Sequence, residues 1–178
     1  MTQKIIALAS GRLVLTALLA TLVGASYVFN LGPYPKVENL AGNSIMPEEQ
    51  ISTAVYLTEF LEQLGPEGRE LYASAQLVDL LNPLLLGIFL TLLIAWLLKA
   101  GNRTDTWNPL VLVPLLMVLG ELWEDALLYL AAGGYPAVPV GIQTLPMATL
   151  LKFTSLTLCL LIVLGLAGLA LAKRLGAK

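Results

Sequence analysis

Four long apolar runs constrain the fold of this chain more than any other feature of its sequence. They cover about residues 13–31, 82–98, 109–132 and 146–172. A helix needs roughly 20 predominantly apolar residues to cross the hydrocarbon core of a bilayer, which is close to the length of each run. The sequence therefore predicts an all-α membrane protein built as a bundle of four transmembrane helices. The first run also has features of a secretory signal, with Val23-Gly24-Ala25 similar to a cleavage site, but its removal would leave the remaining topology unchanged.

Composition favours this class of protein and excludes several others. Of the 178 residues, 57% are hydrophobic and 12% are charged, whereas about a quarter of residues are charged in soluble domains. The net charge is −2 and the few cations form no basic stripe, so nucleic acid is not an expected partner. With no histidine and a single cysteine, Cys159, the chain cannot form His-ligated haem, His/Cys zinc sites, Ser-His-Asp triads or intrachain disulfides. We expect neither a cofactor nor a metal.

The distribution of Lys and Arg predicts how the four helices are oriented. Most cations flank one side of the predicted bundle, at Lys4, Arg12, Lys99, Arg103, Lys173, Arg174 and Lys178. Only Lys36 and Arg69 fall in loops on the other side. Since cytoplasmic loops carry the excess of cations, both termini and the 99–108 loop are predicted to be cytoplasmic. Short loops and the lack of eukaryotic targeting signals favour a bacterial plasma (inner) membrane, with residues 1–178 forming one polytopic domain.

The larger connection on the opposite side predicts a helical cap over residues 45–80. Pro47-Glu48-Glu49 suits the first turn of a helix, and apolar residues recur at helical spacing between Gln50 and Leu64. Gly65-Pro66 should end this amphipathic helix, and a second helix should lead from Pro66 into the second membrane span. Pro83 should break or kink that second helix, which places Asp79 and Asn82 at the outer mouth of the bundle.

Three carboxylates interrupt the third apolar run, at Glu121, Glu124 and Asp125, and their spacing places them together on the helix surface. Counted inward from the predicted outer helix ends, Glu124 and Asp125 lie about 10–12 Å deep and Lys152 about 9 Å deep. We therefore expect Lys152 to pair with Asp125 or Glu124, and Trp123 to be a candidate for lining a pocket. The candidate site comprises Glu121, Trp123, Glu124, Asp125, Lys152, Asp79, Asn82 and Arg69.

Buried charges of this kind are costly, so each is a hypothesis for function, although they can also serve only to hold helices together. The first interpretation is a non-enzymatic membrane protein that binds membrane lipid or a lipid-like ligand, or that is an accessory subunit of a membrane-protein partner. A second is an intramembrane enzyme in which the carboxylates act as general acid and base on an apolar or isoprenoid substrate. A third is a proton-linked carrier, which would need polar residues continuing to the cytoplasmic side.

The layout of four spans with a larger first outer loop resembles that of claudins and of sterol isomerases of the emopamil-binding type. The tryptophan and paired cysteines of the claudin outer loop are missing from residues 32–80, and no sterol-isomerase motif aligns. The resemblance extends to topology alone and implies no activity.

Overall fold

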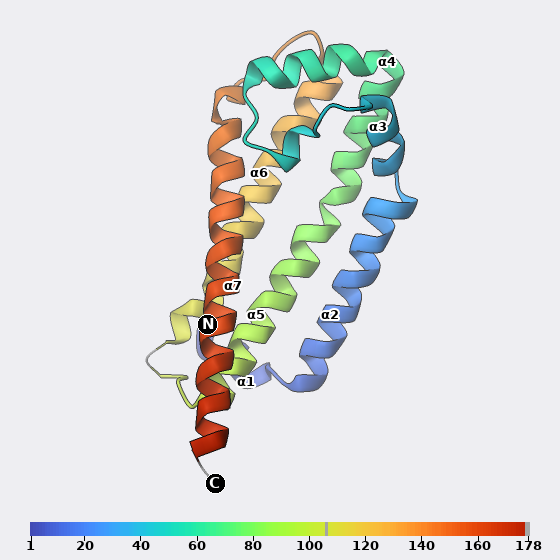
Figure 1. Cartoon of the computed structure of the whole chain (residues 1–178). Coiled ribbons are helices and arrows are strands. Elements are labelled where there is room, and N and C mark those ends of the chain that lie inside the picture. The colour runs from blue at the N-terminus through green and yellow to red at the C-terminus, as the bar shows by residue number, and fades with distance from the viewer. Residues whose placement is uncertain (106, 177–178) are drawn as a thin grey trace.

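The computed structural model is helical throughout and contains no strand over the residues that it describes, 1–105 and 107–176 (Figure 1). This confirms the all-helical prediction. In chain order the elements are α1 (Thr2–Leu8), α2 (Gly11–Ser26), the π-helical turn Tyr27–Leu31, α3 (Tyr34–Ala41), the 3-10 turn Pro47–Glu49, α4 (Ala54–Asp79), α5 (Leu81–Gly101), the 3-10 turn Asn108–Leu112, α6 (Val113–Gly134), the 3-10 turn Ile142–Thr144 and α7 (Leu145–Gly176).

The long helices run side by side as an elongated bundle, and the first part of α4 crosses one end of it (Figure 1). α6 packs along α7, and α2 packs on α5. Because α5 also contacts α6 and α7, it lies between α2 and the α6–α7 pair. Both termini lie toward the end opposite α4 (Figure 1).

The outer cap consists of α3, the Pro47–Glu49 turn and the first half of α4. The expectation that Pro47-Glu48-Glu49 opens a helix over Gln50–Leu64 is wrong, because this turn stands apart and α4 begins only at Ala54. The hydroxyl of Thr53 accepts a hydrogen bond from the Tyr56 amide at 3.2 Å and so caps the helix at that point. Ser52 separately donates to the carbonyl of Pro47 at 2.8 Å, which closes the preceding loop.

A sharp bend at Gly65 divides α4 into a part that crosses the end of the bundle and a part that runs down along it (Figure 1). Gly65 has φ +67°, a conformation that a side chain would strain, and Pro66 follows it. The helix breaks again at Leu80, between α4 and α5. Pro83 lacks the N–H that would bond to the carbonyl of Asp79, so the break falls three residues before the proline.

The third predicted span starts later than expected. Residues Asn108–Leu112 form a 3-10 turn, and α6 begins at Val113. Pro114 therefore lies in the first turn of α6, where the missing N–H of proline removes no helical hydrogen bond.

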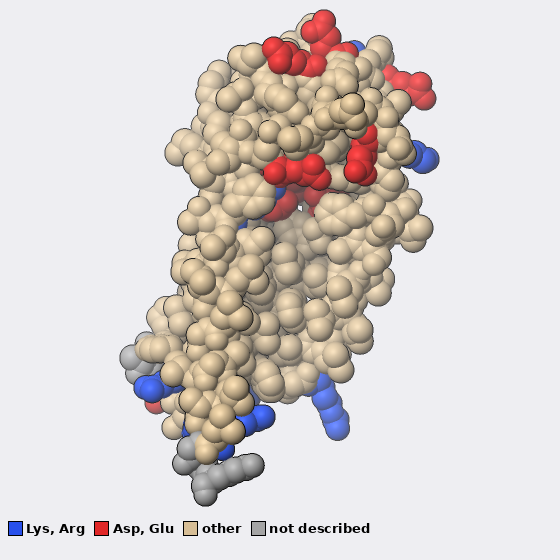
Figure 2. Space-filling view, viewed as in Figure 1, with Lys and Arg blue, Asp and Glu red and all other residues tan. Residues whose placement is uncertain are grey.

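Uncharged side chains cover the flanks of the bundle, and most charges gather toward its two ends (Figure 2). The exposed apolar residues include Leu15, Leu19 and Leu22 of α2, Leu115 and Leu119 of α6, and Leu158, Leu161 and Leu164 of α7. Three helical stretches are long and apolar enough to cross a membrane, and they lie within Gly11–Leu31, Ala54–Gly101 and Ile142–Leu175. α6 is not one of them, since its 22 residues contain three carboxylates.

Candidate functional site

A buried lysine on α7 joins the cap to α6. Lys152 donates to the main-chain carbonyl of Glu48 at 2.9 Å, to Oε2 of Glu124, and to Oε1 of Glu121 at 3.4 Å. Thr149, one turn earlier on α7, donates its hydroxyl proton to the other oxygen of Glu124. An ammonium group has three protons, so these contacts use all the donors that Lys152 has. Within the described part of the chain, both ion pairs belong to this residue.

A glycine allows α6 and α7 to approach closely enough for this pairing. A Cβ atom on Gly120 would lie 2.7 Å from the main-chain nitrogen of Lys152 and 3.1 Å from its Cα. No side chain other than hydrogen fits there without moving a backbone. Because Gly120 directly precedes Glu121, the same contact brings the carboxylates of α6 against α7.

Glu48 descends from the cap into the same region. Its carboxylate accepts hydrogen bonds from the hydroxyl of Tyr72 at 2.6 Å and from Nε2 of Gln76 at 3.1 Å, both on the descending half of α4. Burial raises the pKa of the Glu48 carboxyl, and the hydrogen bond from Tyr72 opposes that rise. Tyr34, which lies beside Glu48, also has a raised pKa because of burial and the nearby carboxylate. Glu48 therefore connects the cap to the bundle through its main chain and its side chain.

A second group of carboxylates, from Asp79, Glu121 and Asp125, has fewer hydrogen-bond donors than acceptor atoms. One oxygen atom from each of Asp79, Glu121 and Asp125 lies within 4.8 Å of the other two. Both oxygens of Asp125 and Oδ1 of Asp79 are buried without a hydrogen-bond partner among the described residues, and so is Oε1 of Gln76. Buried polar atoms in native proteins usually have partners, so each of these requires an explanation.

The structure brings most of the sequence-predicted candidates together. Glu121, Glu124, Asp125 and Lys152 meet between α6 and α7, and Asp79 approaches them from the end of α4. Lys152 pairs with Glu124 and Glu121, whereas Asp125 makes no ion pair with any residue that the structure describes. Asn82 lies beside Asp79.

Two predicted candidates lie apart from the carboxylates. Trp123 is 39% exposed on the outer surface of α6. Its position is two residues from Glu121 and from Asp125, which corresponds to roughly 200° around a helix, so it faces away from both. Arg69 donates to the carbonyl of Leu61 at 3.0 Å, and its guanidinium lies 4.1 Å above the ring of Tyr135. It lines a separate outer cavity of about 460 Å³ between α4 and α6.

Four polar residues of the site were not among the candidates from the sequence: Glu48, Tyr72, Gln76 and Thr149. For three of them, Tyr72, Gln76 and Thr149, helical spacing in the sequence relates the residue to a candidate on the same helix. Tyr72, Gln76 and Asp79 share one face of α4, and Thr149 shares a face with Lys152. Glu48 had no such signal, because nothing in the pattern of a short acidic turn distinguishes a buried carboxylate from the exposed Glu49 beside it.

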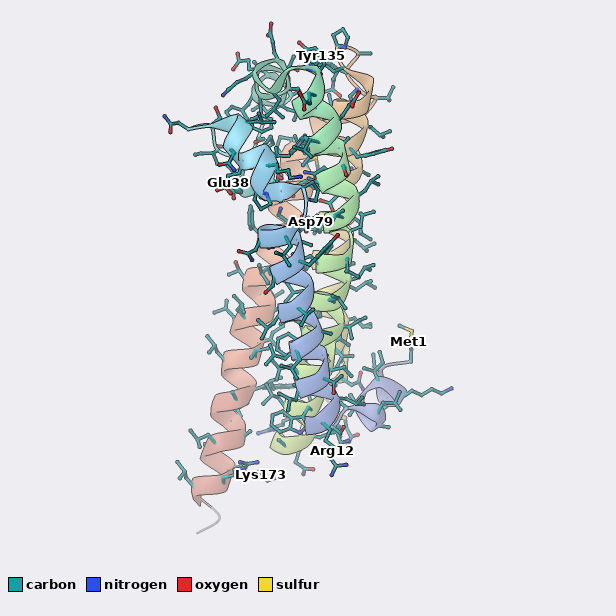
Figure 3. The ribbon with its side chains drawn as sticks, turned by 90° about the vertical axis from the view of Figure 1, so that its right-hand side faces the viewer. Met1, Arg12, Glu38, Asp79, Tyr135 and Lys173 are labelled. Atoms are coloured by element: carbon teal, nitrogen blue, oxygen red, sulfur yellow. The ribbon has the colours of Figure 1, made fainter. Side chains whose placement is uncertain are left out.

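One side of the bundle has a hollow below the cap (Figure 2). The face between α2 and α7 is hollowed just below the cap, and acidic atoms with basic atoms beside them gather at the upper end of this hollow (Figure 2). Figure 3 places Asp79 at the height where α2 gives way to α3. Asp79 and Asp125 are 4% and 1% exposed, whereas the side chain of Glu121 is 17% exposed. Glu121 is thus the member of the carboxylate group most open to a molecule outside the protein.

This arrangement limits the chemistry that the site can perform. Lys152 has no free proton to offer a ligand, whereas Asp79, Glu121 and Asp125 retain acceptor atoms. The site suits proton transfer by carboxyl groups or the binding of a positively charged or donor-rich partner. Comparisons with protein-family models, with curated proteins and with solved structures find no match to this chain.

Proposed function

We propose that the chain is an integral membrane protein in which α2, α5, α6 and α7 cross the bilayer. The apolar flanks and the three sufficiently apolar helical stretches support this assignment. α6 completes the set because its carboxylates face protein instead of lipid: Glu124 and Asp125 are buried, and Lys152 compensates part of their charge. Both termini lie toward the same end of the bundle, which agrees with an even number of crossings (Figure 1).

The same proposal places the cap outside a bacterial plasma membrane and both termini in the cytoplasm. Acidic residues gather at the α4 end and Lys and Arg at the opposite end (Figure 2). Cations concentrate on the cytoplasmic side of membrane proteins, which supports this orientation.

In this membrane setting, the hollow between α2 and α7 binds a lipid-like ligand. The single observation that carries this proposal is a group of buried, partly unpaired carboxylates, of which Glu121 is the most exposed. It is supported by a lateral hollow below the cap with acidic atoms at its upper end (Figure 2). The polar part of an amphipathic molecule would contact this end, and its apolar part would lie against the leucine-rich helices below. Such a ligand could enter directly from the bilayer without crossing the cap.

Native mass spectrometry of the protein in nanodiscs tests this function. The test variant is Glu121→Gln with Asp125→Asn, which removes two charges at the site. The matched control is Glu59→Gln with Glu62→Gln, which removes two charges from exposed cap residues. We expect the wild type and the control to retain one defined small-molecule mass that the test variant loses. Equal retention of bulk lipid by all three proteins would refute the proposal and favour an accessory role in a complex.

Acid–base catalysis is a second candidate because Asp125 is buried and unpartnered beside Glu121, as a proton-transferring pair requires. It predicts chemical conversion of the retained ligand by the wild type and none by Asp125→Asn. A proton-linked carrier lacks comparable support. The buried residues toward the other end of the bundle include an apolar cluster that contains Ile94, Leu98 and Val111.

A further inference from the structure

The three carboxylates of Asp79, Glu121 and Asp125 have the spacing of a coordination shell. They come from two helices, α4 for Asp79 and two adjacent turns of α6 for Glu121 and Asp125. One oxygen of each lies within 4.8 Å of the other two. Oxygens that share one Ca²⁺ at 2.3–2.6 Å are separated by at most about twice that distance. A single ion could therefore contact all three residues at once.

Asp125 provides the second, independent indication of a ligand. It is 1% exposed, both of its oxygens lack a hydrogen-bond partner, and it points into the space shared with Asp79 and Glu121. A buried carboxylate without donors has a desolvation cost that nothing in the surrounding protein offsets. A cation bound among these oxygens would supply the missing interaction.

The local charge also favours a cation. Asp79, Glu121, Glu124 and Asp125 face one ammonium group, that of Lys152. When all four carboxyl groups are ionised, three negative charges remain without a counterion, and a divalent ion would balance two of them. Lys152 contacts only Oε1 of Glu121, at 3.4 Å, so the other oxygen of that carboxylate remains available to an ion.

We propose that Asp79, Glu121 and Asp125 bind one divalent metal cation of the oxygen-preferring class, Ca²⁺, Mg²⁺ or Mn²⁺. Carboxylate oxygens are the preferred ligands of these ions, and the chain has no histidine that would favour zinc or copper at this position. Three carboxylates leave coordination positions for water or for oxygen atoms of a ligand in the hollow. The site modifies the expectation from composition, which foresaw no metal, because only the fold brings Asp79 to α6.

Titration with MnCl₂, followed by the electron paramagnetic resonance signal of free Mn²⁺, tests this site. The protein is purified, stripped with a chelator and reconstituted in phosphatidylcholine nanodiscs, and empty nanodiscs give the blank. We expect the wild type to bind one Mn²⁺ per chain, with competition by Ca²⁺ or Mg²⁺. Asp125→Asn should weaken binding by at least roughly tenfold, since loss of even an outer partner of a metal ligand has an effect of that size. Glu49→Gln, an exposed carboxylate of the cap, should bind like the wild type.

Two results would overturn the proposal: no binding by the wild type above the blank, or an unchanged titration of a folded Asp125→Asn variant. If Asp125→Asn does not fold, Glu121→Gln replaces it, and the wild-type titration is decisive in either case.

The cation site does not depend on the lipid-like ligand. A chain that retains a ligand mass but binds no Mn²⁺ loses only the cation site, and a chain that binds Mn²⁺ but retains no ligand loses only the proposed function.

Discussion

Lys152 Nζ donates to the main-chain carbonyl oxygen of Glu48 at 2.9 Å, across 104 positions of the sequence. This bond joins α7 to the loop that precedes α4, while the same ammonium holds Glu121 and Glu124 of α6. One side chain thus links the cap to two helices of the bundle. The stability of the cap and of the carboxylate site should therefore respond together to changes at this residue.

Replacement of Lys152 by Met should destabilise the protein strongly. The substitution removes the ammonium from Glu121, Glu124 and the carbonyl of Glu48. Loss of one partner of a buried ion pair costs about 3–5 kcal/mol. Thermal unfolding followed by tryptophan fluorescence in detergent measures the effect. Lys36→Met, at an exposed position of α3, is the control and should unfold like the wild type. Similar melting temperatures for both variants would contradict the central role of Lys152.

Gly120→Ala should also lower stability, by about 1–3 kcal/mol, because the added methyl group would overlap main-chain atoms of Lys152. The matched control is Gly165→Ala on α7, where nothing lies within 4 Å of the added atom. Alanine has the better helix propensity, so this control should be neutral or slightly stabilising. Chemical unfolding in a fixed detergent compares the two variants, and equal losses would show that the α6–α7 contact tolerates a wider spacing.

Glu48→Gln should change how stability depends on pH. Burial raises the pKa of Glu48 in the folded protein, so the folded state holds this proton more tightly than the unfolded chain. The stabilisation from protonation is complete below about pH 4.5, the ordinary pKa of the group, and is lost as the pH rises through the folded-state pKa. Glutamine cannot lose a proton, so the variant should gain stability relative to the wild type as the pH increases. Parallel melting-temperature curves from pH 4 to pH 8 would argue against this behaviour.

Cysteine labelling should establish the proposed orientation. In a Cys159→Ala background, Glu59→Cys in the cap and Lys173→Cys near the end of α7 each provide one exposed thiol. A membrane-impermeant maleimide should label Glu59→Cys on intact cells and Lys173→Cys only after the cells are opened. The reverse pattern would show that the cap faces the cytoplasm.

Much of the fold followed from the sequence because helices are regular. The long apolar runs located the helices, and Gly65-Pro66 and Pro83 marked breaks close to where the chain bends, at Gly65 and Leu80. The start of α4 at Ala54 was missed because Pro47-Glu48-Glu49 and Thr53 are both plausible helix starts, and the hydroxyl of Thr53 forms the cap. Local patterns gave two possible starts, and only the folded chain distinguishes them.

The parts of the site that depend on the depth of a residue along its helix were predictable from the sequence. The parts that depend on the rotation of a helix about its own axis were less predictable. Depth alone brought Lys152 to the level of the α6 carboxylates. Lys152 pairs with Glu124 and Glu121 and not with Asp125 because of the rotation of α6 about its axis relative to α7. The close contact of Gly120 with the main chain of Lys152 fixes this rotation. The contribution of Glu48 arises from a contact between residues far apart in the sequence, and helical periodicity contains no information about such contacts.

The pairing of α6 with α7 has a consequence for how the protein reaches its membrane. α6 contains three carboxylates, and the ammonium that pairs with two of them belongs to α7, which begins at Leu145 after a short connection. A segment with unpaired charges partitions poorly into hydrocarbon. In the proposed bilayer setting, biogenesis therefore requires the two segments to enter the lipid as one helical hairpin, and a nascent chain that ends before Lys152 would leave α6 uninserted.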